Sequence, residues 1–196
     1  MPGGAPDDPV VHVSPGPGAT TVELEAVAPD PGRDAAEPPR VALVSGGTLV
    51  PNADGSVTVR DGGAAVGGLT APRGARFESL DDTHLRVRAA GDGAGGAVAT
   101  SLGTEAVARA DWGEREGGRS LAVEPTGWAR EAGRAGADVA WSQLVAADPE
   151  VDTPTMRDQL ECHAIGARDK DTWNLEPWRP DVGLVTTLAA RCNPLP

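Results

Sequence analysis

Four residues near the end of the chain could together perform acid–base chemistry: His163, Lys170, Glu176 and Arg179. A histidine can exchange a proton near neutral pH, while a carboxylate and two cations can orient a substrate and stabilise developing charge. If these side chains converge, they suit metal-free hydrolysis of a phosphodiester or glycosidic bond. We therefore treat all four as candidate catalytic residues, with His163 as the general acid or base.

The same stretch could instead bind a ligand without transforming it. Two tryptophans, an asparagine, a glutamate, an arginine and two prolines fall within residues 173–180. Proline fixes φ and stiffens a loop, and tryptophan offers a large contact area with little entropy to lose. This pattern predicts a contact surface for a protein or a cell-wall glycan, made of Trp173, Asn174, Glu176, Trp178 and Arg179. The structural alternative is a loop that covers the core, in which Glu176 and Arg179 pair with each other.

A helix must position His163. The hydroxyl of Thr153 followed by Pro154 is typical of a helix start. From there Met156, Leu160 and His163 recur at helical spacing, so the histidine shares a face with apolar residues. A histidine on such a face is more often part of the core than a catalyst, and both interpretations remain open.

Other elements of this half follow from local patterns. Residues 106–112 and 119–123 flank a Glu-Gly-Gly turn and predict a β-hairpin. Asp138 is expected to cap a helix that carries Trp141 and Leu144. Residues 182–190 are expected to form a closing strand that leads to Cys192.

The two cysteines, Cys162 and Cys192, predict a disulfide. An even pair in a small chain fits a bridge, and bridges persist in oxidising compartments. Closing this loop would remove about 3.5–4 kcal/mol of unfolded-chain entropy. The alternative is a pair of buried thiols. No CxxC or HxxxH motif is present, and only three histidines occur, so we expect neither a metal site nor a cofactor.

The first half of the chain is β-rich. Short β-branched runs are separated by turn signals, including Asn52-Ala-Asp-Gly55, which is typical of a hairpin. We predict an α+β protein with an all-β, sandwich-like domain at 10–91, a Gly-rich linker at 92–97 and a disulfide-stapled α+β domain at 98–196. Residues 1–9, rich in Pro, Gly and Asp, are expected to be disordered.

Composition excludes several classes of function. The formal net charge is −12, so the basic face that duplex binding requires is missing, and we expect no nucleic-acid partner. No apolar run reaches the 18 or more residues of a membrane span. The first residues lack the basic and apolar regions of a signal peptide. The predicted disulfide nevertheless favours an extracellular or cell-envelope location, and we interpret the start of the chain as that of a mature form.

Residue usage points to a GC-rich coding sequence, such as an actinobacterial one. The chain has one lysine, one phenylalanine and no tyrosine. Residues with AT-rich codons are therefore informative where they persist, and most of them cluster near the C-terminus. After the first methionine they are Asn52, Phe77, Met156, Ile165, Lys170, Asn174 and Asn193.

Several uncommon sequence motifs, which follow one another in a fixed order, indicate a family resemblance. Residues 117–130 (GGRSLAVEPTGWAR), 156–163 (MRDQLECH), 173–180 (WNLEPWRP) and 192–194 (CNP) resemble a family of exported, mainly actinobacterial proteins, domain of unknown function 2599. The resemblance covers about 105–194 and implies an exported protein; it brings no catalytic residues. We therefore expect a secreted or envelope-associated binding protein, with a small secreted hydrolase or antibacterial effector using His163 as the alternative.

Overall fold

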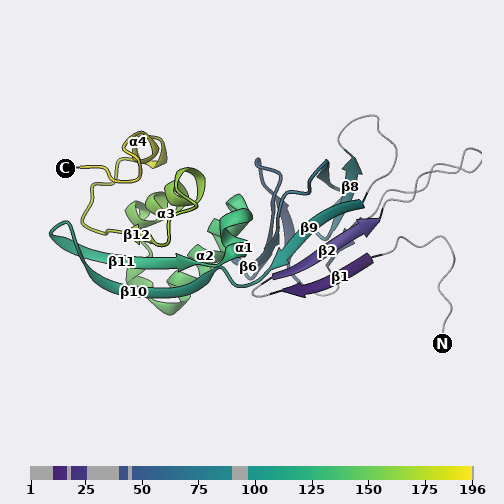
Figure 1. The fold of residues 1–196 in the computed structure, drawn as a ribbon, viewed down its shortest axis with the longest axis horizontal. Coiled ribbons are helices and arrows are strands. Elements are labelled where there is room, and N and C mark those ends of the chain that lie inside the picture. The colour runs from purple at the N-terminus through teal and green to yellow at the C-terminus, as the bar shows by residue number, and fades with distance from the viewer. Residues whose placement is uncertain (1–10, 17–18, 26–39, 44–45, 90–96, 196) are drawn as a thin grey trace, which may run out of the picture.

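The structure is a computed structural model that describes residues 11–16, 19–25, 40–43, 46–89 and 97–195. The disorder expected for residues 1–9 and most of the expected linker, residues 92–96, lie outside the described residues. The predicted mixed α+β class is confirmed: strands form the first half, and a small sheet with helices forms the second (Figure 1).

The first half contains two antiparallel sheets. The larger has the strand order β1-β2-β9-β6-β5-β4, and the smaller has the order β3-β8-β7. Their strands are β1 (Val11–Gly16), β2 (Ala19–Glu25), β3 (Arg40–Ala42), β4 (Thr48–Pro51), β5 (Val57–Asp61), β6 (Ala64–Leu69), β7 (Ala75–Ser79), β8 (His84–Ala89) and β9 (Ala97–Gly103). The expected turn at residues 52–55 joins β4 to β5, as predicted.

The core of this half is thin and aliphatic. Leu49, Val57 and Leu69 of the larger sheet pack with Leu85 of the smaller sheet, and Phe77 is the aromatic residue at its edge. The two sheets therefore face each other as in a sandwich.

The larger sheet continues beyond the expected domain boundary. Strand β9 pairs with β2 along its whole length and with β6 through Gly103 and Leu102. The change of architecture therefore falls between Gly103 and Val107. The expected linker at 92–97 would have placed β9 in the second domain, whereas β9 belongs to the larger sheet of the first half.

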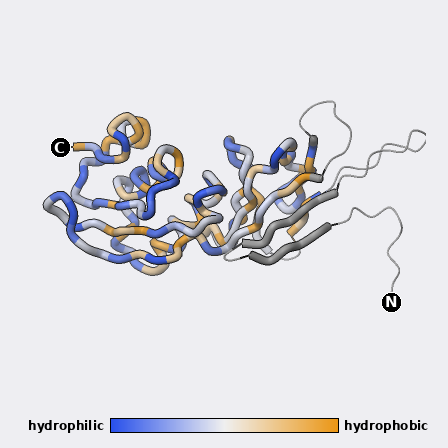
Figure 2. Tube along the Cα trace, in the orientation of Figure 1, coloured by the Kyte–Doolittle hydropathy of each residue, from blue (hydrophilic) through white to orange (hydrophobic). Residues whose placement is uncertain are grey.

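The second half is built on a three-stranded antiparallel sheet. Strands β10 (Val107–Arg115) and β11 (Gly118–Pro125) form the predicted hairpin, and β12 (Trp173–Leu175) pairs with β11. Val123, Leu121 and Trp173 lie in the core against the helices. The middle of the hairpin is apolar and its tip is hydrophilic (Figure 2).

Helices cover one face of this sheet. They are α1 (Gly127–Glu131), α2 (Gly133–Ala147), the short 3₁₀ helix η1 (Pro149–Val151), α3 (Pro154–Gly166) and α4 (Leu184–Ala189). Thr153 caps α3 by accepting a hydrogen bond from the Met156 amide, with Pro154 in the first turn, as predicted. The expected closing strand at 182–190 is instead helix α4, which packs against α3. β-Branched residues favour strands only weakly, so this packing overrides the local preference.

Asp138 does not cap α2, contrary to expectation. It lies inside this helix, 5% exposed, and binds Arg60 and Thr58 of strand β5. The start of α2 is instead capped by the β4–β5 turn, because Asp54 accepts a hydrogen bond from the Arg134 amide at 2.7 Å. The two halves are therefore joined by packing and by specific polar contacts, with α1 and α2 between them (Figure 1).

Candidate functional site

His163 lies on the inner face of α3 and is only 2% exposed. Its Nε2 lies 3.2 Å from the backbone oxygen of Asn174. Because a carbonyl oxygen only accepts hydrogen bonds, Nε2 carries the proton in the neutral ring. The other ring nitrogen, Nδ1, is buried and has no hydrogen-bond partner among the residues that the structure describes. The lone pair of Nδ1 is therefore buried and accepts no hydrogen bond from another described residue.

Burial sets the protonation state of His163. Desolvation lowers the pKa of this histidine to about 4, against the opposing effect of its hydrogen bond to Asn174. The cations Lys170 and Arg115 lower the same pKa further by charge repulsion. The ring is consequently neutral at pH 7, which is the form that a general base requires, but it is closed to solvent.

Glu176 and Arg179 form a buried ion pair of their own, in line with the structural alternative. Their side chains are 1% and 0% exposed, and Arg179 Nε donates to the Glu176 carboxylate. Arg179 also donates to Glu116 Oε2 at 2.7 Å and to the backbone oxygen of Pro194 at 3.1 Å. This guanidinium thus joins the hairpin tip to the C-terminal tail, and each of its three nitrogens already donates a hydrogen bond.

The tryptophan-rich loop at residues 173–180 is packed into the protein and exposes little surface to a ligand. Trp173 is fully buried in the core and therefore offers no surface to a ligand. Trp178 is half-buried, with its ring close to Gly118 and beneath the guanidinium of Arg179 at 4.5 Å. Asn174, half-buried in β12, contributes its backbone oxygen to His163. Of the proposed contact surface, only parts of Asn174 and Trp178 reach solvent.

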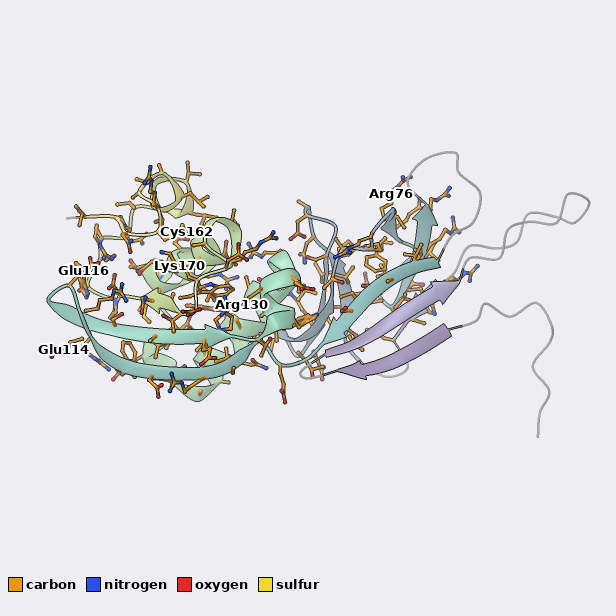
Figure 3. All side chains as sticks on the ribbon, in the orientation of Figure 1. Arg76, Glu114, Glu116, Arg130, Cys162 and Lys170 are labelled. Carbon is orange, nitrogen blue, oxygen red and sulfur yellow. A yellow bond between two sulfur atoms is a disulfide. The ribbon has the colours of Figure 1, made fainter. Side chains whose placement is uncertain are left out.

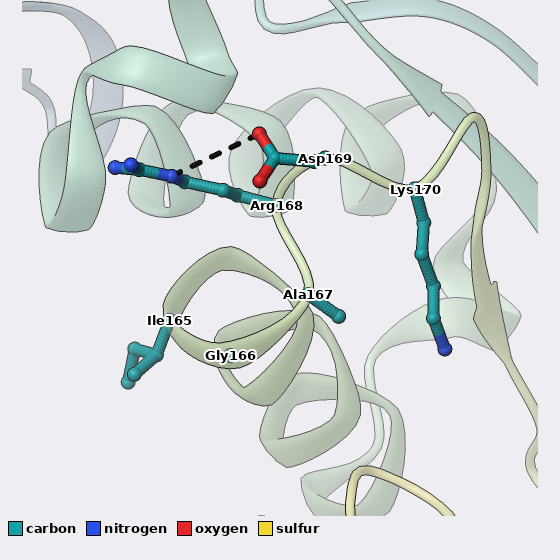
Figure 4. A pocket seen from close by; sticks show the side chains of 6 residues that line it. All are labelled: Ile165, Gly166, Ala167, Arg168, Asp169 and Lys170. Carbon is teal, nitrogen blue, oxygen red and sulfur yellow. Dashed lines mark ion pairs between the residues drawn. The ribbon is translucent and has the colours of Figure 1, made fainter.

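Lys170 is separate from the Glu176–Arg179 pair. It is exposed in the turn between α3 and β12, and it lines an open hollow of about 520 Å³ together with Ile165 and Arg168. Lys170 and Ile165 lie on opposite sides of the end of α3 (Figure 4). Of the four candidate catalytic residues, Lys170 alone lines this hollow.

The α3–β12 turn is held in a defined conformation by Arg130 of α1. This guanidinium donates hydrogen bonds to the backbone oxygens of Arg168 at 2.6 Å, Lys170 at 2.5 Å and Asp171 at 2.9 Å. Sequence reasoning did not single out Arg130, because the contacts span about 40 residues and follow no local pattern. The residues that line the hollow are thus fixed on the helical scaffold.

The most exposed large apolar side chains of the described residues lie on α3, α4 and the C-terminal tail. They are Val185, Leu195 and Ile165, at 81%, 75% and 65% exposure. The predicted disulfide is confirmed: Cys162 of α3 is bonded to Cys192, directly after α4. This bridge ties α4 and the tail to α3 at the C-terminal end of the molecule (Figure 1). We refer to Ile165, Val185 and Leu195 as the apolar end.

The described residues also bear on metal binding and on crossing of a membrane. In the part of the chain that the structure describes, no group of His, Cys, Asp or Glu side chains has a geometry that could hold a metal ion. None of the described helices is both long and apolar enough to cross a membrane.

Comparison with known proteins concerns the second half. Residues 107–195 match the family described as "Protein of unknown function (DUF2599)", which confirms the resemblance found in the sequence. The uncharacterized proteins Rv0477 of Mycobacterium tuberculosis and Mb0487 of Mycobacterium bovis are each 44% identical over 93 residues, covering 43% of this chain and 61% of the relative. Uncharacterized protein ML2452 of Mycobacterium leprae is 35% identical over 81 residues, covering 39% of this chain and 60% of its own. The chain thus spans about three fifths of the length of these relatives, and no solved structure matches it.

Proposed function

Starting from a second half that matches a family without an assigned activity, we propose that this is an exported binding protein that contacts a protein partner through its apolar end. The carrying observation is that the three most exposed large apolar side chains of the described residues, Ile165, Val185 and Leu195, lie on α3, α4 and the tail, which the disulfide ties together. Exposed apolar side chains gathered beside polar residues are typical of protein interfaces.

The disulfide supports the exported location. Cys162 and Cys192 are bonded and are only 1% and 2% exposed, so the bridge is part of the folded core. Such structural bridges persist outside the cytoplasm, in secreted and cell-envelope proteins.

A protein partner is favoured over a cell-wall glycan by the state of the tryptophans. Three of the five are buried, and the rings of Trp112 and Trp178 lie against Arg119 and Arg179. Tryptophans in this arrangement do not offer the open aromatic face on which a sugar ring stacks. The apolar end instead offers aliphatic side chains, which suit a protein surface.

The partner class can be tested with a mycobacterial cell-envelope preparation as the probe. The purified protein is sedimented with envelope fragments that are untreated, digested with protease or digested with muramidase. Binding that is lost after protease treatment and retained after muramidase treatment supports the proposal. The opposite pattern would assign a glycan ligand, and no binding to untreated fragments would contradict an envelope partner.

Hydrolysis with His163 as acid–base residue is the second candidate. The neutral ring and the Nδ1 that has no hydrogen-bond partner among the described residues favour it, since an unprotonated ring nitrogen is what a general base requires. His163→Gln retains a donor for the Asn174 backbone oxygen and removes Nδ1. A hydrolase predicts that this variant loses all turnover of phosphodiester or glycoside substrates while it remains folded. A wild-type protein without such turnover would eliminate the candidate.

A further inference from the structure

The outer face of the smaller sheet in the first half carries a cluster of arginines. Successive side chains of a strand point to opposite faces of its sheet. On β8, Leu85 and Val87 are buried in the core, so the residues that alternate with them lie on the outer face. Strands β3, β7 and β8 together place four arginines on this outer face, and we refer to them as the arginine face: Arg40, Arg76, Arg86 and Arg88.

The strand register brings these arginines side by side. Arg40 lies directly opposite Arg86, and Arg76 lies directly opposite Arg88. The Cα atoms of such opposite residues on antiparallel strands are about 4.5–5.5 Å apart. Figure 3 shows Arg76 in the first half, far from the labelled residues of the second half. Like charges at directly opposite positions destabilise a sheet, so this arrangement opposes folding.

The positive charge of the arginine face is only partly compensated. Among the described strand residues on this face, Glu78 is the acidic one, and its carboxylate lies 2.5 Å from Arg88 Nε and 3.7 Å from Arg86 Nη1. No carboxylate of the described residues lies within ion-pair distance of Arg76, and Arg86 Nε is buried without a hydrogen-bond partner among them. Arg40 has an interaction of its own and does not enter this balance. One glutamate thus faces three arginines, in a chain whose net charge is −12.

The surroundings of the arginine face favour a short ligand. The turn between β7 and β8 carries Asp81 and Asp82, both exposed. A long polyanion or a flat anionic surface would also meet these carboxylates, which repel it, whereas a short segment can contact the arginines alone. An extended peptide presents every second side chain on one face, about 7 Å apart, and Arg86 and Arg88 have the same spacing on β8.

We propose that the arginine face binds a short, extended segment of a partner protein that carries aspartate or glutamate at alternate positions. A guanidinium can donate two parallel hydrogen bonds to one carboxylate, which makes arginine better suited to this ligand than lysine. Bound carboxylates would also relieve the repulsion between opposite arginines. The site lies outside residues 107–195, which match the family, so it does not depend on the apolar end or on the partner proposed for it.

The test uses the purified full chain and a short synthetic peptide of alternating glutamate and threonine. Its affinity is measured by isothermal titration calorimetry, with a glutamine–threonine peptide of the same length as the neutral control. We expect saturable binding of the acidic peptide, at least about tenfold tighter than that of the neutral peptide. The absence of saturable binding, or equal affinity for the two peptides, would overturn the proposal.

Matched variants locate the binding on the arginine face. Arg76→Ala and Arg88→Ala each remove an exposed guanidinium and should each weaken binding of the acidic peptide by about tenfold. Arg109→Ala removes an exposed arginine of β10 in the second half and should leave the affinity unchanged. The proposal fails if either variant of the arginine face binds the peptide like the wild type, or if Arg109→Ala weakens binding equally.

Other occupants of the arginine face give different results. Phosphatidylglycerol vesicles and a short single-stranded oligonucleotide are titrated in the same way, and tighter binding of either than of the acidic peptide would overturn a protein ligand. Sedimentation velocity of the full chain tests a second copy as the occupant. Self-association that Arg76→Ala removes would assign the face to contacts between copies of this chain and contradict a separate partner.

Discussion

Replacement of His163 by glutamine should change how the stability of the protein depends on pH. His163 titrates near 6.5 in the unfolded chain, whereas burial lowers its pKa to about 4 in the folded protein. At a pH between these two pKa values, His163 is protonated in the unfolded chain and neutral in the folded protein. The contribution of His163 to the free energy of unfolding is therefore fully present above pH 6.5, falls as the pH decreases and levels off below about 4.

The magnitude follows from the same two pKa values. A pKa that falls from 6.5 to about 4 corresponds to about 3 kcal/mol of stability lost across this pH range. Glutamine does not titrate, yet it can still donate to the Asn174 backbone oxygen. At pH 7 the variant should therefore be somewhat less stable because it packs less well. Its free energy of unfolding should also lack the pH dependence that His163 contributes.

Urea unfolding at half-unit steps between pH 4 and pH 7.5, for wild type and His163→Gln, measures this directly. The difference between the two curves removes the contribution of the other histidines and of the carboxylates, because both proteins share them. We expect a difference that grows with pH by about 3 kcal/mol. A flat difference would refute the assignment of His163 as a buried neutral residue.

Two further substitutions test the polar contacts that organise the fold. Asp54→Ala removes the carboxylate that caps α2 and should lower the free energy of unfolding by about 1–2 kcal/mol. The control is Asp82→Ala, which removes an exposed carboxylate. An equal loss of stability in both variants would contradict the cap. Arg179→Ala leaves the buried carboxylate of Glu176 without its cation and should lower stability by about 3–5 kcal/mol in urea unfolding. Arg168→Ala, which removes an exposed arginine, should have little effect, and a similarly small loss for Arg179→Ala would contradict the buried pair.

Local sequence signals predicted the local features. The cap and proline at Thr153–Pro154, the hairpin around residues 116–118 and the turn at 52–55 all depend on neighbours within a few positions. The disulfide followed from the presence of only two cysteines, and the helical spacing correctly placed His163 on the apolar face.

Features that depend on distant partners could not be predicted in this way. The cap of α2 comes from Asp54, 80 residues before the amide that it binds, so the local search assigned a cap to Asp138 instead. The tryptophan-rich loop has the composition of a binding surface, but β12 pairs with β11 and turns Trp173 into the core.

The most direct test of the proposed function compares two exposed apolar side chains of similar kind. Ile165→Asp places a charge in the apolar end, whereas Val66→Asp places one on β6 in the other half, where valine is 45% exposed. Affinity for the envelope preparation is measured by sedimentation for both variants and the wild type. The proposal predicts an affinity at least about tenfold weaker for Ile165→Asp and unchanged for Val66→Asp. Equal affinity for Ile165→Asp and wild type would contradict the apolar end as the binding surface.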